Sequence, residues 1–204
     1  VHGSQLLRVH RPLPPHGELK TTAKIAAIFD MKKLAQVLIT TESRLGDEVV
    51  SECEWTLYCM GAGGFGGAPP PKGPKYAAPK DAAPAFSVEL PTHAQQAALY
   101  RLSGDHNPLH IDPDFAAKAG FPQGPILHGL CTFGLLGRAV LSQACASDPS
   151  RLRVLAAQFR KPVWPGDTLR VQGHHLGEGK LALAAEVVER GEAVLAGCWA
   201  EVAS

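Results

Sequence analysis

The 204-residue sequence lacks several features that would place a protein in a class at once. Its five cysteines, an odd number, have neither metal-ligand spacing nor the pattern of a disulfide framework, which favours a reducing, intracellular compartment. The formal net charge is only +1, so neither nucleic acid nor an anionic membrane is expected as the main partner. There is no signal-peptide pattern and no apolar run long enough to span a bilayer. The cysteines are Cys53, Cys59, Cys131, Cys145 and Cys198.

The sequence does contain two strand-rich stretches on either side of a segment that cannot build a core. Apolar or alternating runs predict strands over 19–29, 35–42 and 49–58. Residues 61–85 are mostly Gly, Pro, Ala and Lys and predict a linker. We therefore divide the chain into 1–60, the linker 61–85, and 86–204.

The stretch 86–204 mixes helices and strands. It starts with a short strand near Phe86 and a helix over 95–102. Asp112 and Pro113 predict the start of a short helix and Gly120 its end. The apolar stretch 127–145, which includes Arg138 and Gln143, predicts a helix from about 129 to 146, enclosed by other elements. Four strands follow, over 154–163, 168–175, 180–189 and 193–202.

Two segments of similar sequence, one in each half, suggest an internal repeat. Residues 11–19 (RPLPPHGEL) resemble residues 161–169 (KPVWPGDTL) with one gap, and three strand-like runs follow each. The similarity has two interpretations: a duplication, or two Pro-Gly turns of similar composition. If the repeat is a duplication, its first copy is incomplete, because nothing in it corresponds to residues 86–153. In that case we expect that a strand and a central helix belong ahead of Val1. This missing piece would be supplied by a cleaved fragment or a partner chain, or would have been removed.

The glycine run imitates a cofactor motif. Residues 61–66 (GAGGFG) satisfy G-x-G-x-x-G and follow a predicted strand. A dinucleotide fingerprint must also open a helix whose N-terminus receives the pyrophosphate. Residues 67–71 (GAPPP) cannot form that helix, so we expect no dinucleotide site here.

The segment 100–113 (YRLSGDHNPLHIDP) carries the polar groups with the clearest chemistry. It places Asp105, Asn107 and His110 within six residues on a loop between two predicted helices. Addition of water to a conjugated thioester needs a base to polarise the water and an acid to protonate the α carbon. Asp105 and His110 could share one water for these tasks, while Asn107 orients that water or fixes the loop. Pro108 and the following helix start would stiffen the loop.

Two other interpretations apply to this segment. Gly-Asp and Asn-Pro are ordinary loop dipeptides, so the segment could be only a capped turn. His106 and His110 are four residues apart, the spacing of a zinc pair on a helix. Because Pro108 lies between them, they do not share a helix face, and we expect no metal site.

The segment 124–129 (GPILHG) leads directly into the long predicted helix. The amide of Gly129 would lie at the positive end of that helix and could donate to a thioester oxygen as negative charge develops on it. Alternatively, Gly129 only permits close packing. His128 is interpreted as a core histidine with at most a supporting role.

Together these motifs resemble a known family. Residues 100–121 (YRLSGDHNPLHIDPDFAAKAGF) and 124–134 (GPILHGLCTFG) are similar to the hydratase-2 motif of the MaoC-like (R)-specific enoyl-CoA hydratases. The segments VHGSQ, RPLPPHGEL, GAGGFGG and KPVWPGDTL look like landmarks of the hydratase domain of type 2 peroxisomal multifunctional enzymes. The resemblance covers essentially the whole chain. One departure is His106, where relatives carry tryptophan.

The resemblance implies an α+β double hot-dog fold, in which each half wraps a curved antiparallel sheet around a long central helix. Residues 1–60 would be a partial N-terminal hot-dog, incomplete at its N-terminus, that widens the substrate tunnel, and 86–204 the catalytic hot-dog. The catalytic residues would be Asp105, Asn107 and His110, with Gly129 in the oxyanion hole. We further expect substrate contacts from Gly104, His128, Leu130 and Phe65.

The implied activity is that of a lyase: (3R)-specific hydration of trans-2-enoyl-CoA, or the reverse dehydration, in fatty-acid or acyl-CoA oxidation, with no metal or redox cofactor. The alternatives are a non-catalytic acyl-thioester binding module and a hot-dog thioesterase. An acyl-CoA is the expected substrate, and a homodimer or an association with an N-terminal fragment the expected assembly. The location would be peroxisomal in a eukaryote and cytoplasmic in a bacterium, although the final tripeptide, 202–204 (VAS), is not a Ser-Lys-Leu-type address.

Overall fold

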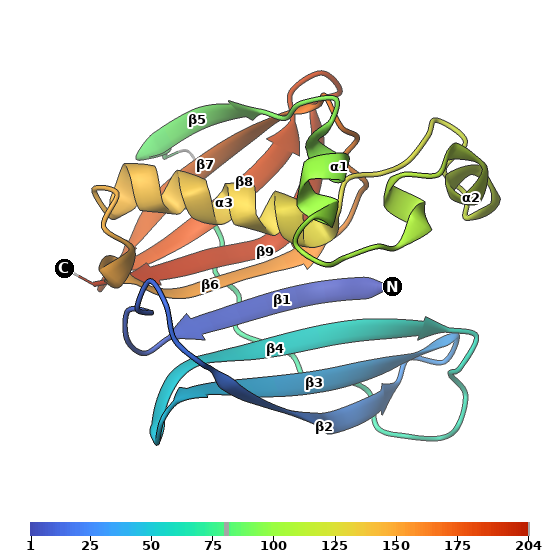
Figure 1. Cartoon of the computed structure of the whole chain (residues 1–204), viewed down its shortest axis with the longest axis horizontal. Coiled ribbons are helices and arrows are strands. Elements are labelled where there is room, and N and C mark those ends of the chain that lie inside the picture. Colours follow the sequence, from blue (N-terminus) through green and yellow to red (C-terminus); the bar gives the residue numbers. More distant parts are fainter. Residues whose placement is uncertain (80–81, 204) are drawn as a thin grey trace.

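The computed structural model describes residues 1–79 and 82–203. Residues 80–81 of the predicted linker and Ser204 of the final tripeptide lie outside the described residues. The described residues form one antiparallel nine-stranded sheet, in the order β2-β3-β4-β1-β6-β9-β8-β7-β5 (Figure 1). The first half contributes β1 (His2–Val9), β2 (Lys20–Asp30), β3 (Leu34–Leu45) and β4 (Glu48–Met60). The second half contributes β5 (Phe86–Pro91), β6 (Leu152–Phe159), β7 (Thr168–Gly177), β8 (Lys180–Val187) and β9 (Glu192–Val202).

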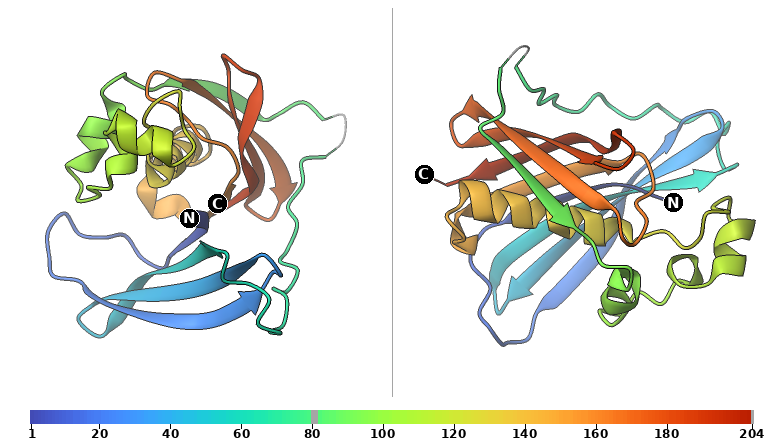
Figure 2. Two further views of the ribbon diagram at one scale, coloured as in Figure 1. Left: turned by 90° about the vertical axis from the view of Figure 1, so that its right-hand side faces the viewer. Right: turned by 90° about the horizontal axis from the view of Figure 1, so that it is seen from above.

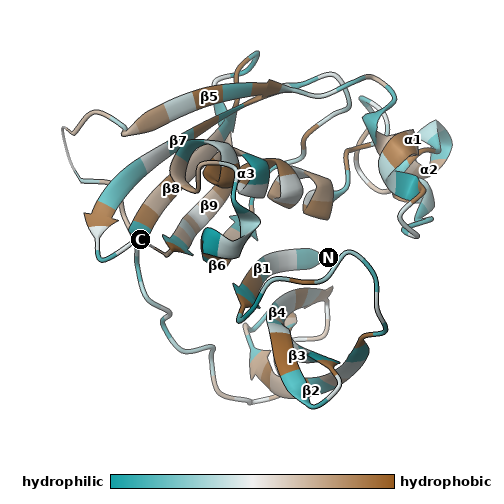
Figure 3. Ribbon diagram, turned by 60° about the vertical axis from the view of Figure 1, so that its left-hand side comes forward, coloured by the Kyte–Doolittle hydropathy of each residue, from teal (hydrophilic) through white to brown (hydrophobic). Residues whose placement is uncertain are grey.

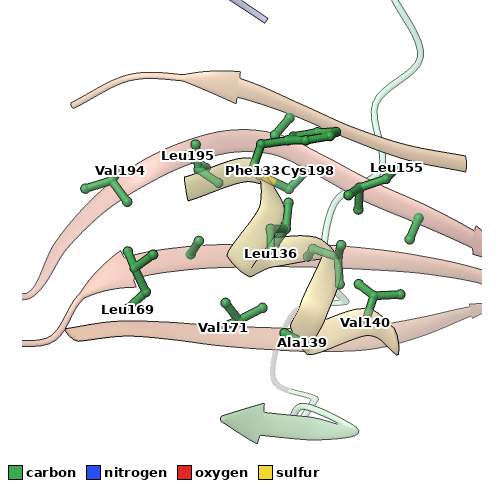
Figure 4. Close-up of a cluster of buried hydrophobic side chains, with 14 of the residues drawn as sticks. Phe133, Leu136, Ala139, Val140, Leu155, Leu169, Val171, Val194, Leu195 and Cys198 are labelled. Atoms are coloured by element: carbon green, nitrogen blue, oxygen red, sulfur yellow. The ribbon is translucent and has the colours of Figure 1, made fainter. Parts of the chain in front are cut away.

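The second half curves around one long helix, α3 (Gly129–Ala144) (Figure 2). Leu136, Ala139 and Val140 of this helix are fully buried and pack against strand residues such as Leu169 and Val171 (Figure 4). Full burial of a leucine or valine side chain contributes about 1.5–3 kcal/mol, so this contact stabilises the second half.

The apolar composition of the long helix predicts that other elements enclose it on every side, and this prediction is wrong. Arg138 and Gln143 are exposed, whereas Leu136, Ala139 and Val140 are buried against the sheet. The reason is that a single curved sheet covers one face of a helix and leaves the opposite face for polar side chains.

The short elements agree with the sequence analysis. The predicted helices at 95–102 and 113–120 are α1 (Gln96–Arg101) and α2 (Pro113–Lys118), and two 3₁₀ turns are added, η1 (Pro108–His110) and η2 (Pro149–Arg151). Asp112 caps α2, because its Oδ1 accepts hydrogen bonds from the amides of Asp114 and Phe115. Gly120 follows α2 at φ +94°, where a residue with a side chain would be strained.

Strand β1 was not singled out in the sequence, and it decides how the halves meet. It pairs with β4 on one side and with β6 on the other, so that Gln5 lies between Trp55 and Ala157. Moving outward from this junction, β4-β3-β2 on one side mirrors β9-β8-β7 on the other. The two similar proline-containing segments, 11–19 and 161–169, directly follow β1 and β6, the two strands that pair at this junction. Their equivalent positions support a duplication over two turns of similar composition.

The two half-sheets differ in what covers them. Figure 3 shows hydrophobic residues on strands of both halves, but among the described residues only the second half has a long helix against its sheet. On the outermost strand β2, Ile25 and Ile28 are 64% and 52% exposed.

The described residues of the linker form no helix or strand, and side-chain contacts hold the linker to both halves. Asp30, the last residue of β2, accepts hydrogen bonds from the amides of Gly64 and Gly66 at 2.8 and 2.7 Å. Further along, Tyr76 packs on Trp199 with ring centroids 4.4 Å apart. The helix that a dinucleotide fingerprint requires is not formed after residue 66. The amides of Gly64 and Gly66 donate to the carboxylate of Asp30 instead of to a phosphate.

All five cysteines are free thiols, as their spacing indicated, and Cys131, Cys145 and Cys198 are buried. Burial raises the pKa of Cys198 to about 12, so this thiol is unreactive at neutral pH. Across residues 1–79 and 82–203, the structure contains no helix with the length and apolar character needed to cross a membrane.

Candidate functional site

A pocket of about 550 Å³ lies at the N-terminal end of α3, lined by residues of both halves. It brings together five of the residues singled out in the sequence: Asp105, Asn107, His110, Gly129 and Leu130. Gly104, His128 and Phe65 do not line it. Gly104 has a positive φ of +109° that shapes the preceding turn, and Phe65 lies in the linker, 53% exposed.

The loop that carries Asp105 is tied together by short-range hydrogen bonds. The amide of Asn107 donates to Oδ1 of Asp105, and the amide of Leu109 donates to Oδ1 of Asn107, both at 3.1 Å. Asn107 is therefore the cap of η1, with Pro108 at its first position. The side-chain oxygen of Asn107 already accepts this one bond, while its NH₂ group stays available to donate to a water.

His110 is the last residue of η1 and is only 9% exposed. Its Nδ1 lies 2.7 Å from the carbonyl oxygen of Ile126. A carbonyl can only accept, so Nδ1 carries the proton and Nε2 of the neutral ring is a free base. The same contact locks the ring orientation, as an acid–base residue requires.

The acidic and basic groups of the site are close together. One potential ligand atom from each of Asp105, His110 and His128 lies within 4.8 Å of the other two. A water that bonds to two groups at about 2.8 Å each can bridge a gap of up to about 5.6 Å. One carboxylate oxygen of Asp105 and one ring nitrogen of His110 are therefore close enough to bind one shared water.

Among the described residues, these three side chains also form the cluster that could hold a metal ion. Two of their ring nitrogens already face carbonyl oxygens, His110 Nδ1 that of Ile126 and His128 Nε2 that of Asp105 at 3.4 Å. The pair of His106 and His110, considered in the sequence and set aside, does not occur in this group, because His106 is exposed and is not part of it. The expectation of a site without a metal stays a prediction.

His128 lies behind the site rather than on its surface. Its side chain is 2% exposed and its ring stacks on that of His110, with centroids 3.9 Å apart. Burial lowers the pKa of His128, and the neighbouring His110 lowers it further, so His128 is neutral near pH 7.

Gly129 is the first residue of α3, and its position is compatible with both roles considered for it. A Cβ at this position would lie 3.3 Å from Cε1 of Phe159, so glycine allows a close approach of the two. Its amide belongs to the first turn of a 16-residue helix, where N–H groups have no partner within the helix and the dipole is positive. The site can therefore offer this amide to a developing oxyanion.

One wall of the pocket was not found from the sequence. The ring of His2 stacks on that of Trp55 at 5.3 Å and contacts that of Phe159 at 4.8 Å. Burial lowers the pKa of His2, which keeps this wall uncharged near pH 7. Only the VHGSQ landmark could have drawn attention to His2, and no local signal marked Trp55.

Two family models match the sequence. One describes a MaoC-like domain and matches residues 75–196, and the other describes the MFE-2 hydratase 2 N-terminal domain and matches residues 1–61.

Among similar proteins, the mouse peroxisomal multifunctional enzyme type 2 is 41% identical over 203 residues, which are 99% of this chain and 27% of that protein. The 3-hydroxyacyl-thioester dehydratase Y of Mycobacterium tuberculosis is 41% identical over 194 residues, 92% of this chain and 66% of that protein. This chain thus spans less than two thirds of the length of both relatives.

The crystal structure of a MaoC-like dehydratase from Phytophthora capsici superposes on all of this chain and 72% of its own, with a TM-score of 0.94 at 34% identity. The double hot-dog fold implied by the sequence resemblance is confirmed.

Proposed function

Because the chain belongs to the MaoC-like family, we propose that it is a lyase, a (3R)-specific 2-enoyl-CoA hydratase that also catalyses the reverse dehydration. The observation that carries this proposal is the approach of Asp105 and His110 to within the reach of one water, beside the N-terminal end of α3.

In the hydration step, Asp105 and His110 hold one water over C3 of the trans-2-enoyl thioester. The water oxygen bonds to C3, and the electrons of the double bond move through C2 onto the thioester oxygen. The amide of Gly129 stabilises that oxyanion. One of the pair takes a proton from the water and the pair returns a proton to C2, so the enzyme ends in its starting protonation state. No metal or redox group is needed for this balance.

The pocket supports an acyl-CoA as the substrate. Arg160 and Lys161 line it, and their positive charges can attract the phosphates of CoA, although Lys161 also pairs with Glu192 at 3.3 Å. The aromatic wall of His2, Trp55 and Phe159 offers an apolar surface to the acyl chain. We place this activity in fatty-acid or related acyl-CoA oxidation.

We propose that residues 1–60 form the N-terminal hot-dog repeat, that 61–85 link the repeats, and that 86–204 form the catalytic hot-dog. The location follows the host: the peroxisome in a eukaryote, as for the peroxisomal relatives, and the cytoplasm in a bacterium. The expected assembly, with a second copy or with a fragment that carries a helix, stays a prediction. Light scattering after size exclusion, with and without such a fragment, tests it.

The test of the activity is hydration of crotonyl-CoA by the wild type and by Asp105→Asn and His110→Ala. Loss of either acid–base group should lower kcat about 10²–10⁴-fold with the fold intact by circular dichroism. His106→Gln is the matched control, because His106 is an exposed histidine of the same loop.

Retained hydration in both active-site variants contradicts the assignment. Binding of acyl-CoA by the wild type without turnover supports the binding module instead, and release of free CoA supports the thioesterase.

A further inference from the structure

His128 has a position that helix capping does not explain. It is the N-cap residue of α3, where Ser, Thr, Asp or Asn usually satisfies a helix amide, yet its side chain makes no capping hydrogen bond. Its Nδ1 is buried and has no hydrogen-bond partner among the described residues. Burying such an atom without a partner costs free energy.

The faces of the His128 ring contact two other aromatic rings. One neighbour is His110, with centroids 3.9 Å apart and ring planes at 30°. The other is Tyr100 of α1, at 4.5 Å. The edge of the ring points elsewhere: Nε2 lies 3.4 Å from the backbone carbonyl oxygen of Asp105, and since a carbonyl accepts, Nε2–H donates.

This contact holds the backbone carbonyl of Asp105, whereas the carboxylate of Asp105 accepts from the amide of Asn107 at 3.1 Å. His110 is held independently by the carbonyl of Ile126, and Asn107 by its cap on η1. In the described part of the chain, the backbone carbonyl of Asp105 accepts no hydrogen bond except that from His128. Asp105 itself is exposed on its loop, so little packing fixes its backbone.

We propose that His128 is a positioning residue, which holds the backbone of Asp105 so that its carboxylate and His110 share one water. The inference rests on the proposed hydratase function. His128 does not line the substrate pocket. In this proposal it acts through Asp105 rather than through the substrate contact expected from the sequence. Because burial keeps the pKa of His128 low, its ring stays neutral and retains one tautomer at neutral pH.

Two substitutions separate the hydrogen bond from the ring. The amide of His128→Gln can place an N–H near the position of Nε2 but has no ring, whereas His128→Phe keeps the ring and loses the donor. With crotonyl-CoA, we expect His128→Phe to lower kcat about tenfold, the usual effect of losing one hydrogen bond, with KM within about threefold. His128→Gln should keep kcat within about threefold of the wild type, as should the control His106→Gln.

A double-mutant cycle then tests whether His128 acts through Asp105. In the Asp105→Asn background, His128→Phe should lower the residual kcat by less than about threefold, because the group that it positions is already disabled. Full additivity of the two losses, or equal losses in the Gln and Phe variants accompanied by equal falls in Tm, overturns the proposal in favour of a purely structural role.

Hydrogen exchange of residues 103–109, measured by mass spectrometry, gives a readout that does not need activity. We expect faster exchange in His128→Phe and wild-type exchange in His128→Gln. Unchanged exchange in the Phe variant refutes the positioning role. If the wild type does not hydrate crotonyl-CoA, the proposed function fails, while the exchange comparison still decides whether His128 holds the loop.

Discussion

Substitution of Gly129 by alanine separates the two roles considered for this residue, close packing and donation to an oxyanion. The added methyl group would lie 3.3 and 3.4 Å from Cε1 and Cδ1 of Phe159, so the ring must shift by a few tenths of an ångström. Alanine also favours the helix over glycine by up to about 1 kcal/mol, which offsets this strain. We therefore expect the free energy of unfolding to change by less than about 1 kcal/mol.

Catalysis should be affected far more than stability. Gly129 and Phe159 both line the pocket, so the methyl group and the displaced ring fill space beside the amide that would receive the thioester oxygen. Loss of one oxyanion donor costs about 2.7–4 kcal/mol, which corresponds to a fall in kcat of about 10²–10³-fold. The assay is the decrease in ultraviolet absorbance of crotonyl-CoA on hydration, alongside thermal unfolding of the same sample.

The packing interpretation predicts the opposite pattern: a clear loss of stability with a normal kcat for the folded protein. A kcat within about threefold of the wild type at unchanged stability would refute the role of the amide. Gly137→Ala is the matched control in the same helix. Its Cβ would lie 3.1 Å from Cδ2 of Leu155, away from the pocket, so it should alter Tm but not kcat.

Three further predictions concern other parts of the molecule. Trp55→Ala should lower kcat/KM for a ten-carbon enoyl-CoA about tenfold, through the loss of apolar contact with the chain, and should leave crotonyl-CoA within about threefold. Asp30→Asn should lower Tm at pH 7, because the amides of Gly64, Lys32 and Gly66 hold the pKa of Asp30 below its usual value. This stabilisation is complete above the unfolded-state pKa of about 3.9 and is lost as the pH falls through the lower folded-state value. Dialysis against a chelator should leave the hydration rate unchanged.

Each of these predictions has its own control. Trp55→Phe keeps an aromatic side chain in the wall, although a smaller one, and the indole N–H that it removes has no partner among the described residues, so chain-length preference should be kept. Equal losses for short and long substrates in Trp55→Ala would contradict the role of the wall. For Asp30, a Tm difference that persists unchanged at pH 2 would rule out linkage to its carboxylate. A rate that falls with the chelator and returns with added Zn²⁺ would show that Asp105, His110 and His128 hold a metal.

Much of the second half follows from short-range patterns. Helix α3, the cap at Asp112 and the glycine after α2 depend on periodicity and on hydrogen bonds between residues a few positions apart. The loop from Asp105 to His110 is shaped in the same local way, which is why its residues could be singled out before the fold was known. The role of each stays a prediction until the variants are assayed.

The junction of the two halves depends on contacts that no local pattern records. Strand β1 is short, and its pairing with both β4 and β6 joins segments far apart in the chain. That pairing brings His2 and Trp55 to the pocket beside Phe159. Likewise, the sequence places His128 next to Gly129, but only the packing of α1 and η1 against the start of α3 stacks its ring on His110 and brings it to Asp105. The sequence by itself thus determined the polar groups and the local turns that hold them. The tertiary structure decided which side chains share a pocket, because burial and pairing depend on distance in space rather than along the chain.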